Sequence, residues 1–120
     1  MRAVEARAKT PRARLLAAFD ALAEWFEGRD FSGCMFINAS AEFAEANYPI
    51  HGAAAEHKGL ILGYLGEQAE AAGAEDASTL AMELMLLMEG AIVMAYVAGE
   101  ADAAGRAKAA ARTLLKGAGL

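Results

Sequence analysis

The sequence has 120 residues, which is enough for one domain with one hydrophobic core and too few for two. It contains 32 Ala but only three Val, four Ile and three Thr, a composition that argues against β-strands and predicts an all-α fold. Residues 1–16 carry five Lys and Arg against one Glu, whereas residues 17–120 carry six against fifteen Asp and Glu. The acidic character of residues 17–120 argues against direct nucleic-acid binding, because phosphate contacts need clustered basic residues.

Cys34 is the only cysteine, so an internal disulfide is excluded. Its neighbours Met35 and Phe36 indicate a small buried hydrophobe, and no His lies near it in sequence to make it a nucleophile. No leader of the secretory type opens the chain, and we therefore expect a cytoplasmic location.

The chain divides into a short leading segment and one helical domain, residues 1–10 and 11–120. The leading segment, with few large apolar residues, is expected to be a partly disordered remnant of a connecting helix. Pro11 suits the first turn of a helix. Leu15, Phe19, Leu22 and Phe26 follow at helical spacing, and Gly28 ends the helix.

Ser32 can cap a short helix that continues to about residue 43. Asn38 and Glu42 lie four residues apart and share a face of it. Their side chains either hydrogen-bond to one another or bind a ligand.

Pro49 suits the start of the next helix, which we expect to run to about Ala72 and to end at Gly73. Its apolar face includes Ile61, Tyr64 and also His57, which is either a core histidine or a polar group in a cavity. His51 and His57 lie six residues apart, on different faces, which argues against a metal site there.

The segment from Asp76 to Gly99 is apolar around nearly its whole circumference, so we predict a central helix that neighbours cover on all sides. Its charge-free run, Gly90 to Gly99, is too short to span a bilayer. One flank ends in small residues that allow close helix contact. The opposite flank contains Met82, Met85, Glu89, Val93 and Tyr96, which suit a ligand pocket.

A last helix from about Asp102 to Lys116 is nearly all Ala on one side. Helices with such faces are stabilised by close packing, so we expect a homodimer in which the last two long helices of each chain form a four-helix bundle. The predicted interface residues are Leu84, Leu87, Ala91, Ala95, Ala98, Ala104, Ala107, Ala111 and Leu114.

Four spaced segments stand out within about residues 11–116: FSGCMFINA at 31–39, EF at 42–43, AEHK at 55–58 and MEGA at 88–91. With the order of helices, they resemble the C-terminal domain of TetR-type transcriptional regulators. The resemblance implies a five-helix domain that dimerises and holds a small-molecule inducer, while a separate N-terminal helix-turn-helix binds the operator. Nothing before Pro11 matches that helix-turn-helix, so we expect no specific DNA binding by this chain itself. It is either a fragment of a longer regulator or a natural product without the DNA-binding head.

We therefore expect the effector-binding and dimerisation domain of a TetR-like repressor, with a small hydrophobic or amphipathic ligand, no cofactor, no metal, no membrane and no catalysis. The alternative is a stand-alone dimerisation module or small-molecule carrier. A small enzyme using Glu89, His57 and Tyr96 is the rival from another class. Glu89 is the key residue, because a buried carboxylate needs a partner. His57 and Asn38 are the candidate partners in a ligand pocket. If there is no open pocket, Glu89 simply bonds to Tyr96 or to a neighbouring helix. The predicted pocket comprises Trp25, Phe26, Cys34, Met35, Asn38, His57, Tyr64, Met82, Met85, Glu89 and Tyr96.

Overall fold

The computed structural model describes residues 4, 7–28 and 49–120, and for residues 49–55 and 57 it describes the backbone alone. The helices that it describes are α2 (Pro11–Glu27), α4 (Pro49–Ala72), α5 (Ala77–Val97) and α6 (Ala103–Gly117). The described part of the chain contains helices and no strand, which confirms the predicted all-α class. The short helix predicted to start at Ser32 would be the fifth, and it lies outside the described residues.

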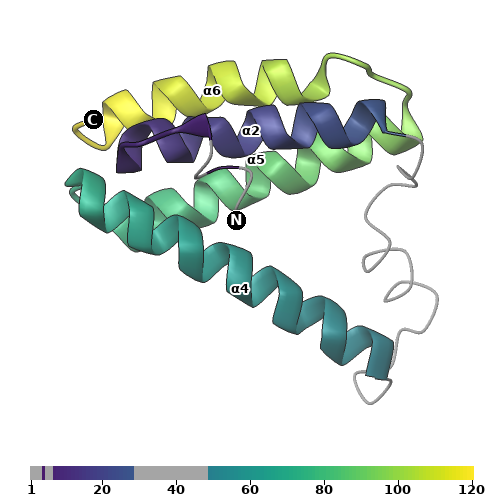
Figure 1. The fold of residues 1–120 in the computed structure, drawn as a ribbon, viewed down its shortest axis with the longest axis horizontal. Helices are drawn as coiled ribbons and strands as arrows, with labels where there is room; N and C mark the ends of the chain where they lie inside the picture. Colours follow the sequence, from purple (N-terminus) through teal and green to yellow (C-terminus); the bar gives the residue numbers. More distant parts are fainter. Residues whose placement is uncertain (1–3, 5–6, 29–48) are drawn as a thin grey trace.

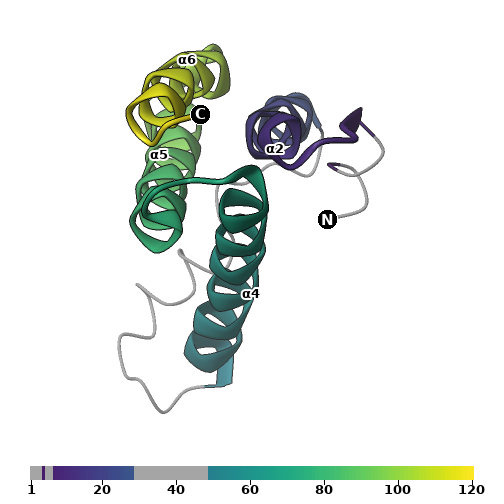
Figure 2. The same ribbon diagram turned by 90° about the vertical axis from the view of Figure 1, so that its left-hand side faces the viewer.

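Helices α2 and α5 form the centre of the molecule, since each of them contacts the three other helices. Helices α4 and α6 lie on opposite sides of this pair (Figures 1 and 2). The C-terminal half of α4 lies against α5, whereas its N-terminal half diverges from the α2–α5 pair (Figure 1). Two cavities lie between α2, α4 and α5, in the region that we name the wedge.

The helix ends follow from local chemistry. The Thr10 side chain accepts a hydrogen bond from the backbone N–H of Ala13 at 3.2 Å, and Pro11 occupies the first turn of α2. Asp76 caps α5 in the same way through the N–H of Thr79, also at 3.2 Å. Gly73, at the end of α4, has a φ of 93°, a backbone conformation that favours glycine. The predicted starts and ends of these helices are thus confirmed to within a residue or two.

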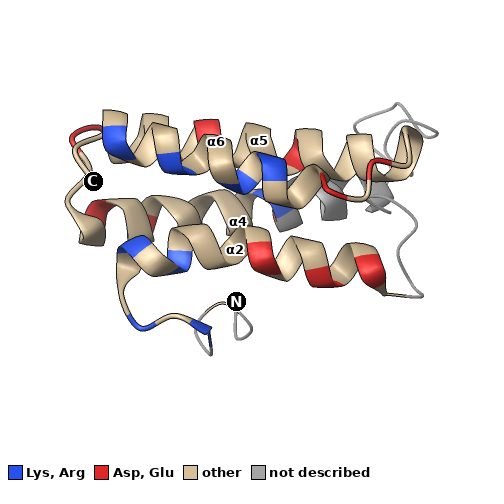
Figure 3. Ribbon diagram, turned by 90° about the horizontal axis from the view of Figure 1, so that it is seen from above, with Lys and Arg blue, Asp and Glu red and all other residues tan. Residues whose placement is uncertain are grey.

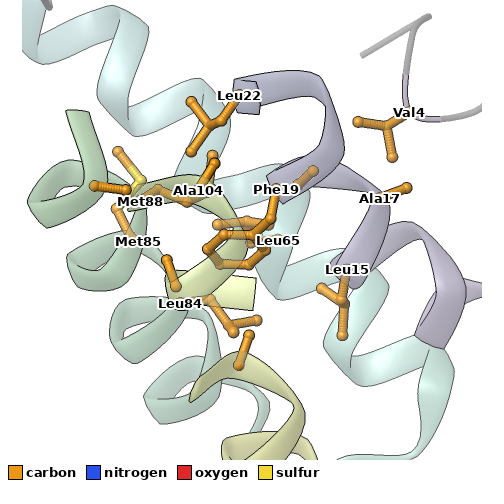
Figure 4. Packing of buried hydrophobic residues seen from close by; sticks show 14 of the residues in the cluster. Val4, Leu15, Ala17, Phe19, Leu22, Leu65, Leu84, Met85, Met88 and Ala104 are labelled. Atoms are coloured by element: carbon orange, nitrogen blue, oxygen red, sulfur yellow. The ribbon is translucent and has the colours of Figure 1, made fainter. Parts of the chain in front are cut away.

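The hydrophobic core is built from all four helices. Its largest fully buried side chains are Phe19, Leu15, Leu65, Leu84 and Leu115. Leu15, Phe19 and Leu22 point from α2 toward the space between the other helices (Figure 4). The amphipathic pattern predicted for α2 therefore faces the core as expected.

Helix α6 packs against α2 and α5 through its alanine side, because small side chains allow two helix backbones to approach closely. An ion pair joins its polar side to α2: Lys108 Nζ lies 2.9 Å from Asp20 Oδ1 and 3.0 Å from Asp20 Oδ2. The basic residues of α6 and the acidic second half of α2 can be followed in Figure 3.

The small-residue faces of α5 and α6 pack within this chain, and their predicted role in a dimer stays a prediction. Leu84, Ala91, Ala104, Ala107 and Ala111 are buried within the single chain, although Ala91 and Ala107 also line a groove on the outer side of α5 and α6. The reason is that α6 has little else to bury, and its alanine face is covered by α2 and α5. Among the other predicted interface residues, Ala98 is exposed, while the half-buried ones are Leu87, Ala95 and Leu114.

Within the described part of the chain, neighbours do not cover α5 on all sides. Six large apolar side chains of α5 are between 44% and 75% exposed: Met82, Leu86, Val93, Met94, Tyr96 and Val97. By length and composition alone this 21-residue helix could cross a bilayer. That is weak evidence, because the core helix of a soluble protein passes the same test.

The leading segment contributes to the core, which its composition did not suggest. Val4 and Ala8 are buried, and Arg7 forms an ion pair with Glu24 of α2. Arg14 Nε also donates a hydrogen bond to the Ala8 carbonyl oxygen at 3.2 Å. The described part of the segment is therefore attached to α2, and Val4 lies beside the core in Figure 4.

Candidate ligand-binding site

Two neighbouring cavities lie between α2, α4 and α5. The first, which we name the Glu89 cavity, has a volume of about 230 Å³ and is lined by Leu22, Trp25, Lys58, Ile61, Met85, Met88, Glu89 and Ile92. The second, the Tyr64 cavity, has about 190 Å³ and is lined by Val4, Ala18, Ala21, Leu22, Trp25, Ile61, Tyr64, Leu65 and Met88. Because the two share the walls Leu22, Trp25, Ile61 and Met88, they lie side by side.

Helical spacing explains how these walls form. Met85, Met88, Glu89 and Ile92 recur at intervals of three and four residues, so they share one face of α5. Lys58, Ile61 and Leu65 follow the same rule on α4. The α5 face is therefore apolar except for one carboxylate, and the α4 face is apolar except for one ammonium group.

Lys58 and Glu89 meet across the Glu89 cavity. Lys58 Nζ lies 2.7 Å from Glu89 Oε1, and the two side chains are only 29% and 25% exposed. A half-buried carboxylate must be compensated, and here a cation from the neighbouring helix does so. Glu89 is thus paired, as one of the predicted alternatives required, but its partner is Lys58.

The partners predicted for Glu89 were His57 and Asn38. Asn38 lies outside the described residues, and the structure describes only the backbone of His57. Lys58 is the next residue along α4 after His57, and it belongs to the AEHK segment. The signal that could have identified it is its spacing of three from Ile61, which places both on one helix face.

The structure brings together about half of the predicted pocket residues that it describes. Trp25, Met85 and Glu89 line the Glu89 cavity, and Trp25 and Tyr64 line the Tyr64 cavity. Phe26 is half-buried beside Trp25, with the ring centroids 6.0 Å apart. Met82 and Tyr96 are about half exposed and line neither of these cavities, so their assignment to a pocket stays a prediction. Cys34 and Met35 lie outside the described residues.

Residues missed from the sequence include Lys58, Met88 and Ile92. The two apolar ones lie one residue before and three residues after Glu89, and the predicted pocket flank contained Met82, Val93 and Tyr96 in their place. On a helix that is apolar nearly all round, no change of polarity marks where the pocket face ends.

The chemistry of both cavities suits binding. Most of their described walls are aliphatic, thioether and aromatic groups, and Lys58 and Glu89 form an ion pair among them. Within the described part of the chain, no three His, Cys, Asp or Glu side chains gather closely enough to hold a metal ion. An apolar pocket with a few polar groups that fix orientation is typical of a small-molecule site.

A further hollow lies on the outer side of α5 and α6. This α5–α6 groove has a volume of about 530 Å³ and is lined by Leu86, Leu87, Gly90, Ala91, Met94, Glu100, Ala103, Arg106, Ala107 and Ala110. Leu86 and Met94 are more than half exposed in it. An exposed apolar surface of this kind is typical of a protein–protein contact.

Comparison with known proteins identifies the family of this chain. Residues 11–111 match the family described as "Tetracyclin repressor-like, C-terminal domain". The HTH-type transcriptional regulator YjdC of Escherichia coli K12 is 27% identical over 84 residues, which cover 70% of this chain and 44% of YjdC; the protein of the same name in Shigella flexneri matches equally.

Solved structures show the same fold. A TetR-type transcriptional regulator from Streptomyces avermitilis superposes with a TM-score of 0.85 at 26% identity, over 94% of this chain and 61% of its own. SCO4454, a TetR-family regulator from Streptomyces coelicolor, gives 0.87 at 20% identity, over 97% and 61%. The chain thus spans less than two thirds of the length of each of these relatives.

Proposed function

Since the chain belongs to the family of tetracyclin repressor-like C-terminal domains, we propose that it is the effector-binding and dimerisation domain of a TetR-like transcriptional repressor. The ligand is a small hydrophobic or amphipathic molecule that binds in the wedge between α2, α4 and α5. Dimerisation uses the outer sides of α5 and α6, which together with those of a second chain form a four-helix bundle.

One observation carries the ligand-binding part of the proposal: the half-buried Lys58–Glu89 pair lines a cavity whose other described walls are apolar. A pair placed there gives no large stability advantage over well-packed apolar residues, because both ions lose water. It does supply the polar groups that orient a ligand. A cavity that served only as filled core would gain more from an aliphatic pair at the same two positions.

The exposed face of α5 supports the dimerisation part. Leu86, Val93 and Val97 follow one another at spacings of seven and four residues, so they form one stripe that the four described helices leave open. The α5–α6 groove runs beside this stripe. Helices that pack across a twofold axis would bury both at once.

The ligand-binding function is tested with the chain itself. We expect native mass spectrometry, Trp25 fluorescence and melting temperature to reveal binding within a panel of small lipophilic compounds. Trp25 is the only tryptophan and lines both cavities, so bound ligand should change its emission.

A matched pair of variants locates the site. Met88→Phe fills space shared by both cavities and should weaken binding, whereas Met82→Phe, on the exposed side of the same helix, should not. Circular dichroism checks that both variants keep the helical fold. The cavities would be part of a filled core if mass spectrometry shows no retained molecule and if no compound of the panel changes the Trp25 emission or the melting temperature.

A further inference from the structure

Gly90 lies inside α5 and lines the α5–α6 groove. A glycine within a helix is less favourable than an alanine, because it loses more backbone freedom on folding. Gly90 is exposed, and a Cβ atom added to it would meet no atom of the described part of the chain within 4 Å beyond its own turn of helix. Its φ is not among the positive ones. The described fold therefore requires a glycine here neither for packing nor for backbone conformation.

We propose that α5 packs antiparallel against α5 of a second copy of the chain, with the twofold axis at Gly90, so that the two glycines face one another. The inference rests on the proposed dimerisation, and it specifies where on α5 the contact is centred and which residues meet across it.

The residues around Gly90 are arranged almost symmetrically. Leu86 and Met94 lie four residues before and after it, and Leu87 and Val93 lie three residues before and after it. At these spacings all four share the Gly90 side of α5. Leu86, Val93 and Met94 are 64%, 44% and 51% exposed, and Leu87 is half-buried. This side of the helix therefore has a gap at Gly90 and large apolar side chains on both sides of the gap.

Such an arrangement is complementary to itself. In a twofold contact, residue i of one chain meets residue j of the other, and j meets i. With the axis at Gly90, Leu86 of each chain meets Met94 of the other, while the two glycines allow the helix backbones to approach closely. A partner of different sequence would have to match this order by coincidence, whereas a second copy supplies it by symmetry.

The α5–α6 groove provides space for the side chains of the second α5. Beside Gly90 it is lined on the α6 side by Ala103, Ala107 and Ala110, and its volume is about 530 Å³. Small residues at these positions leave room that leucine and methionine side chains from the second copy can fill. The contact would bury the exposed apolar side chains of α5 in both chains, and apolar burial drives association.

A glycine that serves the dimer and not the single chain has an unusual signature: its replacement by alanine should have opposite effects on the two. Gly90→Ala, made in the monomeric Leu86→Glu chain, should raise the melting temperature by a few degrees, because alanine favours the helix. In the otherwise wild-type chain, Gly90→Ala should raise the dimer dissociation constant roughly tenfold, since two added methyl groups meet at the axis. Sedimentation equilibrium measures the dissociation constant, and circular dichroism follows the melting.

Gly63→Ala is the matched control. Gly63 is also exposed, inside α4, and a Cβ atom added to it would meet no atom of the described residues within 4 Å beyond its own turn. Helix α4 lies on the other side of the α2–α5 pair from α6 (Figures 1 and 2). Gly63→Ala should therefore raise the melting temperature in the same way and leave the dimer dissociation constant unchanged.

A pair of charges tests which residues meet. Leu86→Glu should weaken the dimer, and adding Met94→Lys should recover at least about tenfold of the lost affinity, because each carboxylate then meets an ammonium group of the other chain. Within one chain these positions are eight residues apart, about 12 Å along the helix, which is too far for the pair to form internally. Adding Val97→Lys to Leu86→Glu is the control and should give no recovery. Equal recovery by both lysines, or by neither, would contradict the proposed register.

The remaining outcomes separate this inference from the proposed function. If the wild-type chain is monomeric at every concentration, the proposed dimerisation fails and the inference fails with it. If Leu86→Glu dissociates the dimer while Gly90→Ala leaves its dissociation constant unchanged, dimerisation through α5 stands and its centre at Gly90 is wrong. A lower melting temperature of the monomeric chain with Gly90→Ala would show that Gly90 packs against another part of its own chain, which would also overturn the proposal.

Discussion

Asp76 shows how one side chain determines where α5 begins. Its carboxylate accepts hydrogen bonds from the Thr79 hydroxyl at 2.8 Å, from the Thr79 backbone N–H at 3.2 Å and from the Ser78 hydroxyl at 3.2 Å. These bonds favour the ionised form, so the pKa of Asp76 is lowered from its ordinary value, with the Thr79 hydroxyl as the largest cause. They also satisfy one of the N–H groups that the first turn of a helix leaves without a partner.

Asp76→Ala should therefore lower the melting temperature at pH 7 by a few degrees, because the cap of α5 is lost. The effect depends on pH in a defined direction. A carboxyl group whose pKa is lower in the folded state than in the unfolded state contributes stability above its unfolded pKa, about 3.9 for Asp. This contribution is lost as the pH falls through the lowered folded value. Thermal melts of both proteins between pH 7 and pH 2 should show the difference shrinking in acid.

Glu75→Ala is the matched control, because it removes an exposed carboxylate from the preceding residue and leaves the cap in place. Its melting temperature should stay close to that of the wild type across the same range. If both variants lower the melting temperature by the same amount, the negative charge of this turn stabilises the protein and the hydrogen bonds of the cap do not.

At the scale of a whole helix, α6 depends on the fit of its alanine face against α2 and α5. Ala111 is completely buried in that face, whereas Ala109, two residues earlier, is exposed. A larger side chain at a close helix contact forces the backbones apart or takes an unfavourable rotamer. The two alanines therefore form a matched pair for testing how closely the helices pack.

Ala111→Leu should reduce the free energy of unfolding by about 1–3 kcal/mol, the usual effect of overpacking a well-packed core. Ala109→Leu should change it by no more than about 0.5 kcal/mol, as expected for an exposed helix position. Urea unfolding followed by circular dichroism measures both. A stable Ala111→Leu variant would indicate that α6 lies against its neighbours more loosely than the structure shows.

The helices themselves could be predicted from the sequence because their ends are marked locally. Pro11 and Pro49 each occupy a first helical turn, Asp76 caps α5, and Gly73 stops α4 at a φ that few other residues adopt. None of these signals depends on distant parts of the chain. The positions of these residues in the sequence were therefore enough to predict where the helices begin and end.

The faces of α5 could not be predicted in the same way. Its residues are apolar on nearly every side, so the pattern contains no polar side to mark which flank meets α6, which meets α4 and which stays open. The flank of Leu84 and Ala91 was assigned to a second chain, and both side chains are already buried within this one. The Lys58–Glu89 contact joins residues 31 positions apart, and only the crossing of α4 and α5 brings them together.

For the whole molecule, the open face of α5 matters more than any single residue. Monomeric proteins rarely leave a large contiguous apolar patch exposed. Here Leu86, Met94 and Val97 are 64%, 51% and 75% exposed, on the helix that is also the most apolar in the described part of the chain. A second copy placed on this face by a twofold axis would bury the α5–α6 groove of both chains.

Leu86→Glu should therefore convert the proposed dimer into a folded monomer. A carboxylate enclosed in an apolar contact without a partner costs several kcal/mol, so the dissociation constant should rise roughly a hundredfold or more, at about 1.4 kcal/mol for each factor of ten. In the monomer position 86 faces water, so the helical content should not change. Leu60→Glu is the control: Leu60 is 70% exposed, but on α4, away from the proposed interface, and its variant should stay as dimeric as the wild type. Light scattering over a range of protein concentrations distinguishes the three chains. Equal dimer dissociation constants for all three chains would exclude this face of α5 as the dimer contact.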